Sequence, residues 1–142
     1  MKIHFVMLGK TRRAEIRALL DDYSARIGRF AEVQVTELRE DSAALRKLTL
    51  DSAATVVLLD DAGKPQTSAQ FAGWLGEARD RGAREIVFLC GGAEGFPESL
   101  RRRATQKLSL SPLTFSHELA RTMLAEQVYR AFAILAGHPY PK

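Results

Sequence analysis

The distribution of apolar positions along the chain predicts five strands. Three runs are almost wholly apolar, as in parallel strands covered on both faces, and they are Lys2–Leu8, Thr55–Leu59 and Glu85–Cys90. Two further segments, Glu32–Thr36 and Lys107–Ser111, alternate between polar and apolar residues, which is typical of strands with one exposed face.

The segments between these strands repeat apolar residues at intervals of three and four, the spacing that places them on one face of a helix. Thr67 with Gln70 three positions later resembles a capping box, and Ser116 is a suitable N-cap for a helix that Gly137 would end. A short helix begun by Pro97 would carry three arginines. The other expected helices cover about residues 12–27, 41–48, 67–81 and 117–136, and the first would bury Ile16, Leu19, Leu20, Tyr23 and Ile27.

Strands that alternate with helices predict one α/β domain built on a largely parallel sheet. A length of 142 residues suits a single domain or one subunit of an oligomer, and 46% hydrophobic residues supply enough apolar surface for a core. The expected unit is therefore a single domain over residues 1–142.

The positive charge of the chain is concentrated near its C-terminal end. Lys and Arg number 21 and Asp and Glu 17, for a formal charge of +4, and residues 101–142 hold seven of the basic but only two of the acidic side chains. Arg101, Arg102 and Arg103 form either a solvated helix face or a surface that faces phosphate groups, because cations near a polyanion gain affinity by releasing counterions.

Composition also limits the class of protein. The chain has no run of about 18 apolar residues, and its apolar N-terminal run is too short for a signal peptide, so we expect a cytoplasmic protein with no membrane partner. The single cysteine, Cys90, cannot form an intrachain disulfide, and with three scattered histidines it indicates no metal site. Because Cys90 ends an apolar strand, we expect a small core residue rather than a nucleophile.

Candidate binding residues gather where three predicted strands end, and ligands of open parallel sheets lie beyond the carboxyl ends of the strands. Glycines at 91, 92 and 95 would let the backbone approach a ligand closely, although an ordinary tight turn would use them too. Their spacing matches neither the dinucleotide fingerprint nor the phosphate-binding P-loop. Asp60, Asp61 and Lys64 by themselves indicate a solvated turn. The three exits are Leu59–Lys64, Cys90–Gly95 and Ser109–Phe115.

Two histidines and a tyrosine near the C-terminus are candidate functional groups. His117 would lie at a helix N-terminus, where the helix dipole disfavours its charged form, so it could act as a neutral hydrogen-bonding group or simply help to cap the helix. His138 and Tyr140 lie between prolines, in a tail that could engage a base and phosphates of RNA. Packing of this tail on a helix or on another subunit is the alternative.

Four segments and the tail together resemble the RlmH family, small bacterial methyltransferases of the SPOUT class. They occur in the same order as in that family and extend over almost the whole chain. The resemblance implies a single-domain SPOUT-type α/β fold with a C-terminal trefoil knot, in which the segment after the last strand threads through a loop. The segments are Leu58–Lys64, Phe88–Gly95, Leu108–Thr114 and Leu124–Ala131, followed by His138-Pro139-Tyr140.

The resemblance also implies an activity. It implies a homodimer that transfers a methyl group from S-adenosyl-L-methionine to N3 of a pseudouridine in helix 69 of large-subunit (23S) ribosomal RNA, acting on assembled ribosomes. The three strand exits would hold the cofactor, and we expect a side chain placed at Gly92 to fill the crevice for its adenosine. The implied cofactor-binding residues are Leu59, Gly91, Gly92, Leu110, Ser111, Pro112, Leu113, Thr114 and Phe115.

Catalysis of this transfer requires loss of the N3 proton and correct placement of the base. A histidine could hold the proton, an arginine could lower the pKa of the base, and the tyrosine could stack on it. The candidate catalytic residues are His117, Arg121, Arg130, His138 and Tyr140.

The chain departs from the family pattern at two positions, and two alternative functions stay open. Ala93 stands where the family commonly has proline, and Lys142 stands where its tail often ends in arginine, whose planar bidentate contact lysine cannot reproduce. The alternatives are a catalytically inactive ribosome- or RNA-binding module of the same fold and a knotted methyltransferase acting on transfer RNA. Binding of S-adenosylmethionine would separate the enzymes from the inactive module.

Overall fold

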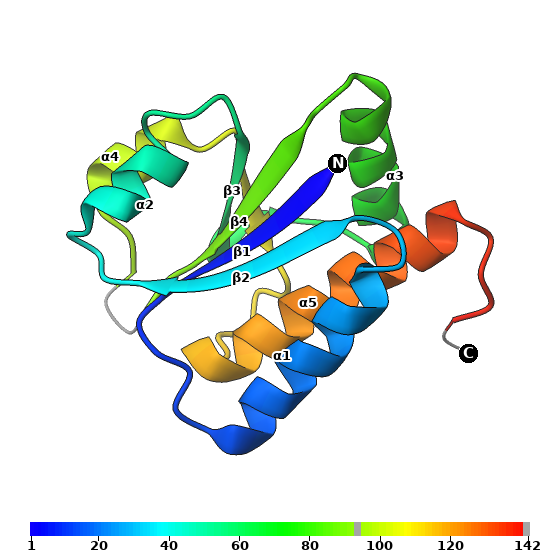
Figure 1. Ribbon diagram of the computed structural model, residues 1–142, viewed down its shortest axis with the longest axis horizontal. Coiled ribbons are helices and arrows are strands. Elements are labelled where there is room, and N and C mark those ends of the chain that lie inside the picture. The colour runs from blue at the N-terminus through cyan, green and yellow to red at the C-terminus, as the bar shows by residue number, and fades with distance from the viewer. Residues whose placement is uncertain (93–94, 141–142) are drawn as a thin grey trace.

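Five parallel strands form one sheet in the order β2-β1-β4-β3-β5 (Figure 1). The computed structural model describes residues 1–92 and 95–140, so Ala93 and Lys142 lie outside the described residues. The parallel α/β architecture predicted from the alternation of patterns is confirmed. The strands are β1 (Lys2–Leu8), β2 (Glu32–Leu38), β3 (Thr55–Pro65), β4 (Glu85–Cys90) and β5 (Gln106–Ser109).

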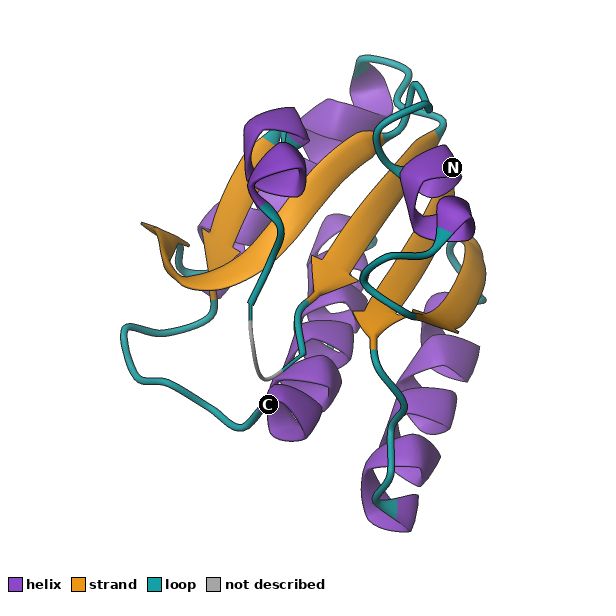
Figure 2. Cartoon of the chain, turned by 90° about the vertical axis from the view of Figure 1, so that its left-hand side faces the viewer, coloured by secondary structure: helices purple, strands orange, loops and turns teal. Residues whose placement is uncertain are grey.

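Helices cover both faces of the sheet (Figures 1 and 2). One face packs against α1, α3 and α5, and the other against the short helices α2 and α4. Within the described part of the chain, no helix combines the length and apolarity needed to cross a membrane. The helices are α1 (Ala14–Ile27), α2 (Ala43–Leu48), α3 (Ser68–Asp80), α4 (Glu98–Arg103) and α5 (His117–Leu135).

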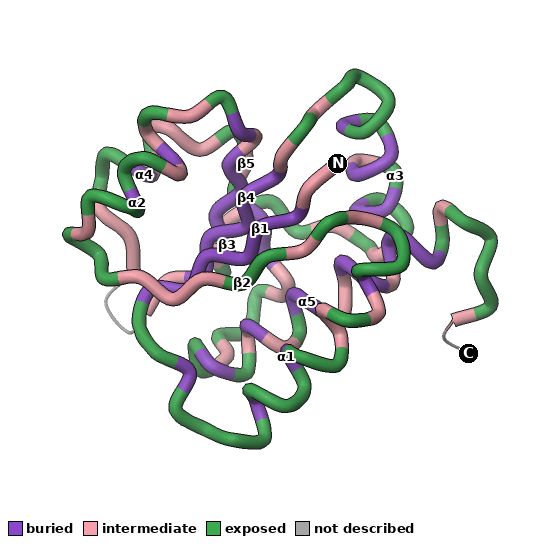
Figure 3. Tube along the Cα trace, viewed as in Figure 1, coloured by how far each residue is buried: buried purple, intermediate pink, exposed green. Residues whose placement is uncertain are grey.

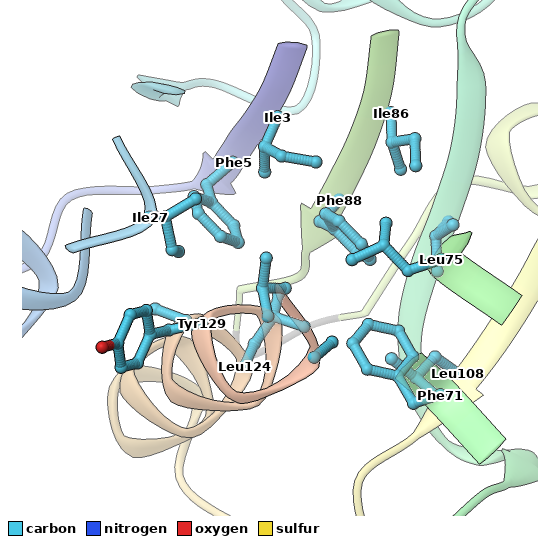
Figure 4. Close-up of a cluster of buried hydrophobic side chains, with 14 of the residues drawn as sticks. Ile3, Phe5, Ile27, Phe71, Leu75, Ile86, Phe88, Leu108, Leu124 and Tyr129 are labelled. Atoms are coloured by element: carbon cyan, nitrogen blue, oxygen red, sulfur yellow. The ribbon is translucent and has the colours of Figure 1, made fainter. Parts of the chain in front are cut away.

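The central strands are buried on both faces because successive side chains point in opposite directions. Phe5 of β1 and Phe88 of β4 face α5, where they meet Leu124 (Figure 4). Val6 and Leu89, their neighbours in sequence, face α2 and α4 instead. The unbroken apolar runs of the sequence therefore reflect two cores, one on each side of the sheet. Figure 3 shows this burial concentrated in the central strands.

The helix signals of the sequence act as predicted. The Thr67 side chain accepts a hydrogen bond from the Gln70 backbone N–H, and the Gln70 side chain accepts one from the Thr67 N–H, which completes the capping box. Ser116 caps α5 by accepting from the Leu119 N–H at 3.3 Å. Gly137 follows α5 with φ +69°, a left-handed conformation that favours glycine.

Two local predictions are wrong. Leu19 was expected in the buried face of α1 but is 42% exposed, because α1 turns only a narrow face, with Ile16, Leu20 and Ile27, towards its neighbours. The expected turn after Leu59 is partly strand, since β3 continues to Pro65 and pairs with β5 again from Lys64 after a shift in register.

Candidate functional site

A cavity of about 510 Å³ lies where β3 stops pairing with β4, beyond the carboxyl end of β4 and beside the segment that follows β5. Figure 2 shows the central strands ending at this common edge of the sheet. The volume falls within the range of small-molecule sites, roughly 300–1,000 Å³. The three strand exits picked out in the sequence therefore meet at one place, as parallel strands require.

The lining of the cavity contains eight of the nine residues predicted to bind a cofactor. Leu59, Gly91, Gly92, Leu110, Ser111, Leu113, Thr114 and Phe115 line it, and Pro112 does not. Of the other lining residues, Asp60, Asp61, Cys90 and Gly95 lie in the predicted strand exits, and His117 is a predicted catalytic residue. The sequence pattern did not single out Phe96, Arg101, Ser116 and Ala120 as cavity residues, because they lie on a helix or next to one and reach the cavity only in the folded chain.

The two adjacent glycines are needed for close approach to other parts of the protein. A Cβ atom at Gly91 would lie 3.2 Å from the ring of Phe96, and one at Gly92 would lie 3.0 Å from the carbonyl oxygen of Leu8. Gly92 lines the cavity, and a side chain placed there would first meet the backbone of β1 at Leu8. Gly92 thus seats the loop against β1.

Asp61 and Lys64 are exposed, as predicted for a solvated turn, but the carboxylates of Asp60 and Asp61 are both engaged. Asp60 Oδ2 lies 3.0 Å from Arg101 Nη1. Asp61 Oδ2 accepts a hydrogen bond of 2.6 Å from the Thr114 hydroxyl, and the Asp61 carbonyl accepts one from Ser109. These contacts tie the exit of β3 to α4 and to the segment after β5.

The three consecutive arginines have different environments, so neither interpretation applies to all of them. Arg101 pairs with Asp60, and Arg103 Nη2 donates to the carbonyls of Ser52 and Ala54 at 3.0 and 2.8 Å. Only Arg102 is a solvated side chain, with Glu98 one turn before it.

His117 is the candidate catalytic residue that lines the cavity. It is the first residue of α5, and Ser116 before it provides the cap through its own side chain. His117 is therefore not needed for capping, and it lines the cavity from the positive end of a 19-residue helix.

Arg121 does not line the cavity and is fully buried. Its Nη1 donates to the Thr11 hydroxyl at 2.7 Å and its Nη2 to the Leu8 carbonyl at 3.1 Å. Burial lowers the pKa of this guanidinium, and a nearby thiol and carboxylates oppose that shift. These bonds hold the loop between β1 and α1, which is the role that the structure gives to Arg121.

Cys90 is a buried core residue, as predicted. Burial raises the pKa of its thiol to about 12, against a partial opposing effect of Arg121. A thiol of this kind stays protonated at neutral pH and is a poor nucleophile.

The remaining candidate catalytic residues lie in the C-terminal half of α5 and in the tail that follows it, whereas His117 is the first residue of α5. Figure 1 shows this tail leaving the end of α5 opposite its first turn. Tyr140 packs edge-on against Tyr129, and its hydroxyl donates to Glu126 at 2.8 Å, while burial raises its pKa. Arg130 pairs with Glu126 at 2.6 Å. The alternative that the tail packs on a helix is thus correct within one chain. From position 117 to position 130, α5 rises about 20 Å.

Comparison with known proteins agrees with this geometry. A family model described as "Predicted SPOUT methyltransferase" matches residues 1–141. The chain belongs to this family. The SPOUT methyltransferase aligns over 99% of its length with proteins named "Ribosomal RNA large subunit methyltransferase H". Those of Solibacter usitatus and Geobacter metallireducens are 43% and 40% identical to it, with 99% and 98% of their own chains covered. The family resemblance noted in the sequence is confirmed.

A solved structure shares the fold of this SPOUT methyltransferase at low identity. The crystal structure of a probable methyltransferase from Bordetella pertussis Tohama I superimposes with a TM-score of 0.56 at 11% identity, over 92% of this chain and 95% of that one. At this identity the likeness concerns the fold alone.

The cavity suits the methyl donor that membership in a methyltransferase family implies. Leu59, Leu110 and Leu113 provide apolar walls, as the adenine of S-adenosylmethionine requires. Backbone at Gly91 and hydroxyls at Ser111 and Thr114 provide polar groups nearby. The residues present therefore fit S-adenosylmethionine.

Proposed function

We propose that this protein transfers a methyl group from S-adenosyl-L-methionine to N3 of a pseudouridine in helix 69 of 23S ribosomal RNA on assembled ribosomes. The observation that carries the proposal is that three strand exits line one cavity. Relatives that align over the full length of the chain bear the name of a large-subunit rRNA methyltransferase. The chemistry needs a bound methyl donor beside a docking surface for RNA.

The protein's contribution to cofactor binding is to fix three loops relative to one another. Hydrogen bonds from Thr114 and Ser109 to Asp61 connect two of them. The third packs closely against the carbonyl of Leu8 at Gly92. When bound, S-adenosylmethionine supplies a methyl group already activated by its sulfonium. Rigid loops then contribute mainly by orientation, which converts a bimolecular encounter into an effectively unimolecular step.

We propose that His117 accepts the proton that leaves N3 of the base. It lines the cavity, and an imidazole nitrogen can accept a hydrogen bond from the N3–H of the base. Arg121 acts indirectly, by holding the backbone beneath the glycine loop. In this proposal Tyr140, Arg130 and His138 contact the target nucleotide.

The separation of these groups along α5 supports a homodimer. His117 and Arg130 of one chain are about 20 Å apart along the helix axis, too far to act on one base. Two exposed apolar side chains one helical turn apart, Leu119 and Met123, lie on α5 near the cavity, and Leu113 in its wall is 71% exposed. We propose that a second copy covers this face and that its tail reaches the cavity.

The same proposal includes the remaining properties of a knotted methyltransferase. We propose that residues 110–115 thread through a loop to form the C-terminal trefoil knot, and that residues 1–142 act as one domain. A substrate of assembled ribosomes implies a cytoplasmic location.

The deciding experiment is methylation of ribosomes from a strain that lacks this protein. Purified protein and S-adenosylmethionine are added to assembled ribosomes, free rRNA and transfer RNA, and mass mapping locates the methyl group. We expect methylpseudouridine in helix 69 only with ribosomes. Methylation of transfer RNA instead would show the alternative enzyme, and failure to bind S-adenosylmethionine by calorimetry would show the inactive module.

A further inference from the structure

The loop between β1 and α1 carries exposed basic side chains that have few carboxylate partners. In this loop, which we call the basic arm and define as residues 10–13, Lys10, Arg12 and Arg13 are exposed and Thr11 is buried. Within residues 1–92 and 95–140, the carboxylate partner of Arg13 is the exposed Glu15, at 3.2 Å. Among the residues that the structure describes, no carboxylate lies within 4 Å of the Lys10 or Arg12 charge.

The backbone of the basic arm is held in place although its side chains face outwards. Glu118 Oε1 accepts hydrogen bonds from the backbone N–H groups of Arg12 at 3.1 Å and Arg13 at 3.0 Å. The buried Arg121 donates to the Thr11 hydroxyl, and the Thr11 N–H donates to Glu37. The arm is therefore a fixed platform, in which the buried polar groups orient the backbone and leave the cations free.

These contacts place the arm at the border of the cavity. Glu118 follows His117, which lines the cavity. The arm starts just beyond Leu8, whose carbonyl lies under Gly92. Figure 1 shows the loop after β1 passing beside the first turn of α5, at the end remote from the C-terminal tail.

The cations of the C-terminal third, where the charge excess of the sequence lies, are mostly engaged within the protein. Arg101 and Arg130 pair with carboxylates, Arg103 donates to two backbone carbonyls, and Arg121 is buried. A cation already bonded inside the protein gains little from a phosphate. Free positive charge beside the cavity is thus found in the basic arm, which belongs to the part of the sequence that has no excess of basic over acidic residues.

We propose that Lys10 and Arg12 bind backbone phosphates of the RNA that presents its base to the cavity. The proposal rests on the function proposed above. Phosphate contacts fix the register and orientation of a nucleic acid without reading its sequence, and a rigid arm whose backbone is bonded to the turn that carries His117 would transmit that register directly to the reacting base. Arg13 and Arg17 are less suited because Glu15 and Glu37 already neutralise them.

The test compares the double variant Lys10→Ala/Arg12→Ala with the matched variant Arg81→Ala/Arg84→Ala. Arg81 and Arg84 are also exposed, and they precede β4, at the sheet edge opposite the cavity. Both variants lose the same charge, so a general effect of net charge would appear in both. Ribosomes lacking this modification serve as substrate at salt concentrations from 50 to 200 mM, and calorimetry gives the affinity for S-adenosylmethionine.

We expect the Lys10/Arg12 variant to have a higher KM for ribosomes and a flatter salt dependence, with unchanged affinity for S-adenosylmethionine. Two lost phosphate contacts reduce the fall in ribosome affinity between 50 and 200 mM salt by about ten-fold. The Arg81/Arg84 variant should behave like the wild type. Equal salt slopes for both variants, or a loss of S-adenosylmethionine affinity in the Lys10/Arg12 variant, would overturn the inference. Absence of methylation by the wild type would instead reject the proposed function.

Discussion

Asp60 and Arg101 form an ion pair in the lining of the cavity, with 3.0 Å between carboxylate Oδ2 and guanidinium Nη1. The pair joins the exit of β3 to the first turns of α4. The Asp60 side chain is 13% exposed and that of Arg101 is 37% exposed, so water screens the pair only in part. Arg101 is therefore a component of the cavity wall, although in the sequence it is one of three identical neighbours.

Single alanine substitutions should separate the three arginines. Arg103→Ala should lower the free energy of unfolding by roughly 1–3 kcal/mol, because its two bonds to backbone carbonyls are charge-assisted. Arg102→Ala should change it by less than about 0.5 kcal/mol. Arg101→Ala should weaken S-adenosylmethionine binding more than it changes stability. Urea unfolding and calorimetry measure the two effects, and equal behaviour of all three variants would contradict the assignment.

Ala120 offers a direct test of the cofactor site. It lines the cavity from α5, so Ala120→Phe should abolish binding of S-adenosylmethionine by occupying the space. Ala25→Phe, on the exposed side of α1, is the matched control and should bind normally. Calorimetry is combined with thermal unfolding of both variants. Normal affinity in a folded Ala120→Phe protein would place the cofactor elsewhere.

The proposed homodimer predicts recovery of activity by mixing two inactive variants. His117→Ala removes the group at the cavity, and Tyr140→Phe removes the hydroxyl at the far end of α5. A mixed dimer has one intact site if the tail acts on the partner's cavity, so an equal mixture refolded together should regain about a quarter of wild-type activity. Methyl-transfer rates check this. A mixture no more active than its parents would mean that both groups act within one chain.

Burial of Cys90 predicts a decline of stability at high pH. The folded protein raises the thiol pKa from its ordinary value of 9.0 to about 12. Between these values the unfolded chain loses the proton while the folded protein keeps it, so the free energy of unfolding falls as the pH rises. The raised pKa of Tyr140 acts in the same direction. Urea unfolding from pH 8 to 11 should show a smaller decline for Cys90→Ala, and identical slopes would contradict the burial argument.

Glu118 should control the order of the basic arm. The backbone N–H groups of Arg13 and Arg12 lower the pKa of this carboxyl, so it is ionised at neutral pH. Glu118→Gln removes the charge that strengthens both bonds, and we expect faster hydrogen exchange at the amides of Arg12 and Arg13. Glu15→Gln removes an exposed carboxylate from the same region and should leave those amides protected. Equal exchange in both variants would show that Glu118 does not hold the arm.

The elements of this fold could be predicted where the signal is local. The capping box at Thr67, the cap at Ser116 and the apolar runs of β1 and β4 each depend on neighbouring residues, and the structure contains all of them. The location of the cavity followed as well, since parallel strands bring their carboxyl ends to one edge. Leu19 was misassigned because helical spacing gives the face of a helix but not its width.

The order of strands and helices, the parallel sheet and the three loops that meet in the cavity could be predicted from local patterns, because hydrophobic period and capping are short-range properties. Which charged side chains are free depends instead on contacts made in the folded protein. Pairing of Asp60 with Arg101, burial of Arg121 and support of the basic arm by Glu118 join residues 41 to 113 positions apart. Folding pairs some cations, such as Arg101, with carboxylates that are distant in the sequence. Among the residues that the structure describes, it leaves others, such as Lys10 and Arg12, without such a partner beside the cavity, because charges interact through space and not along the chain.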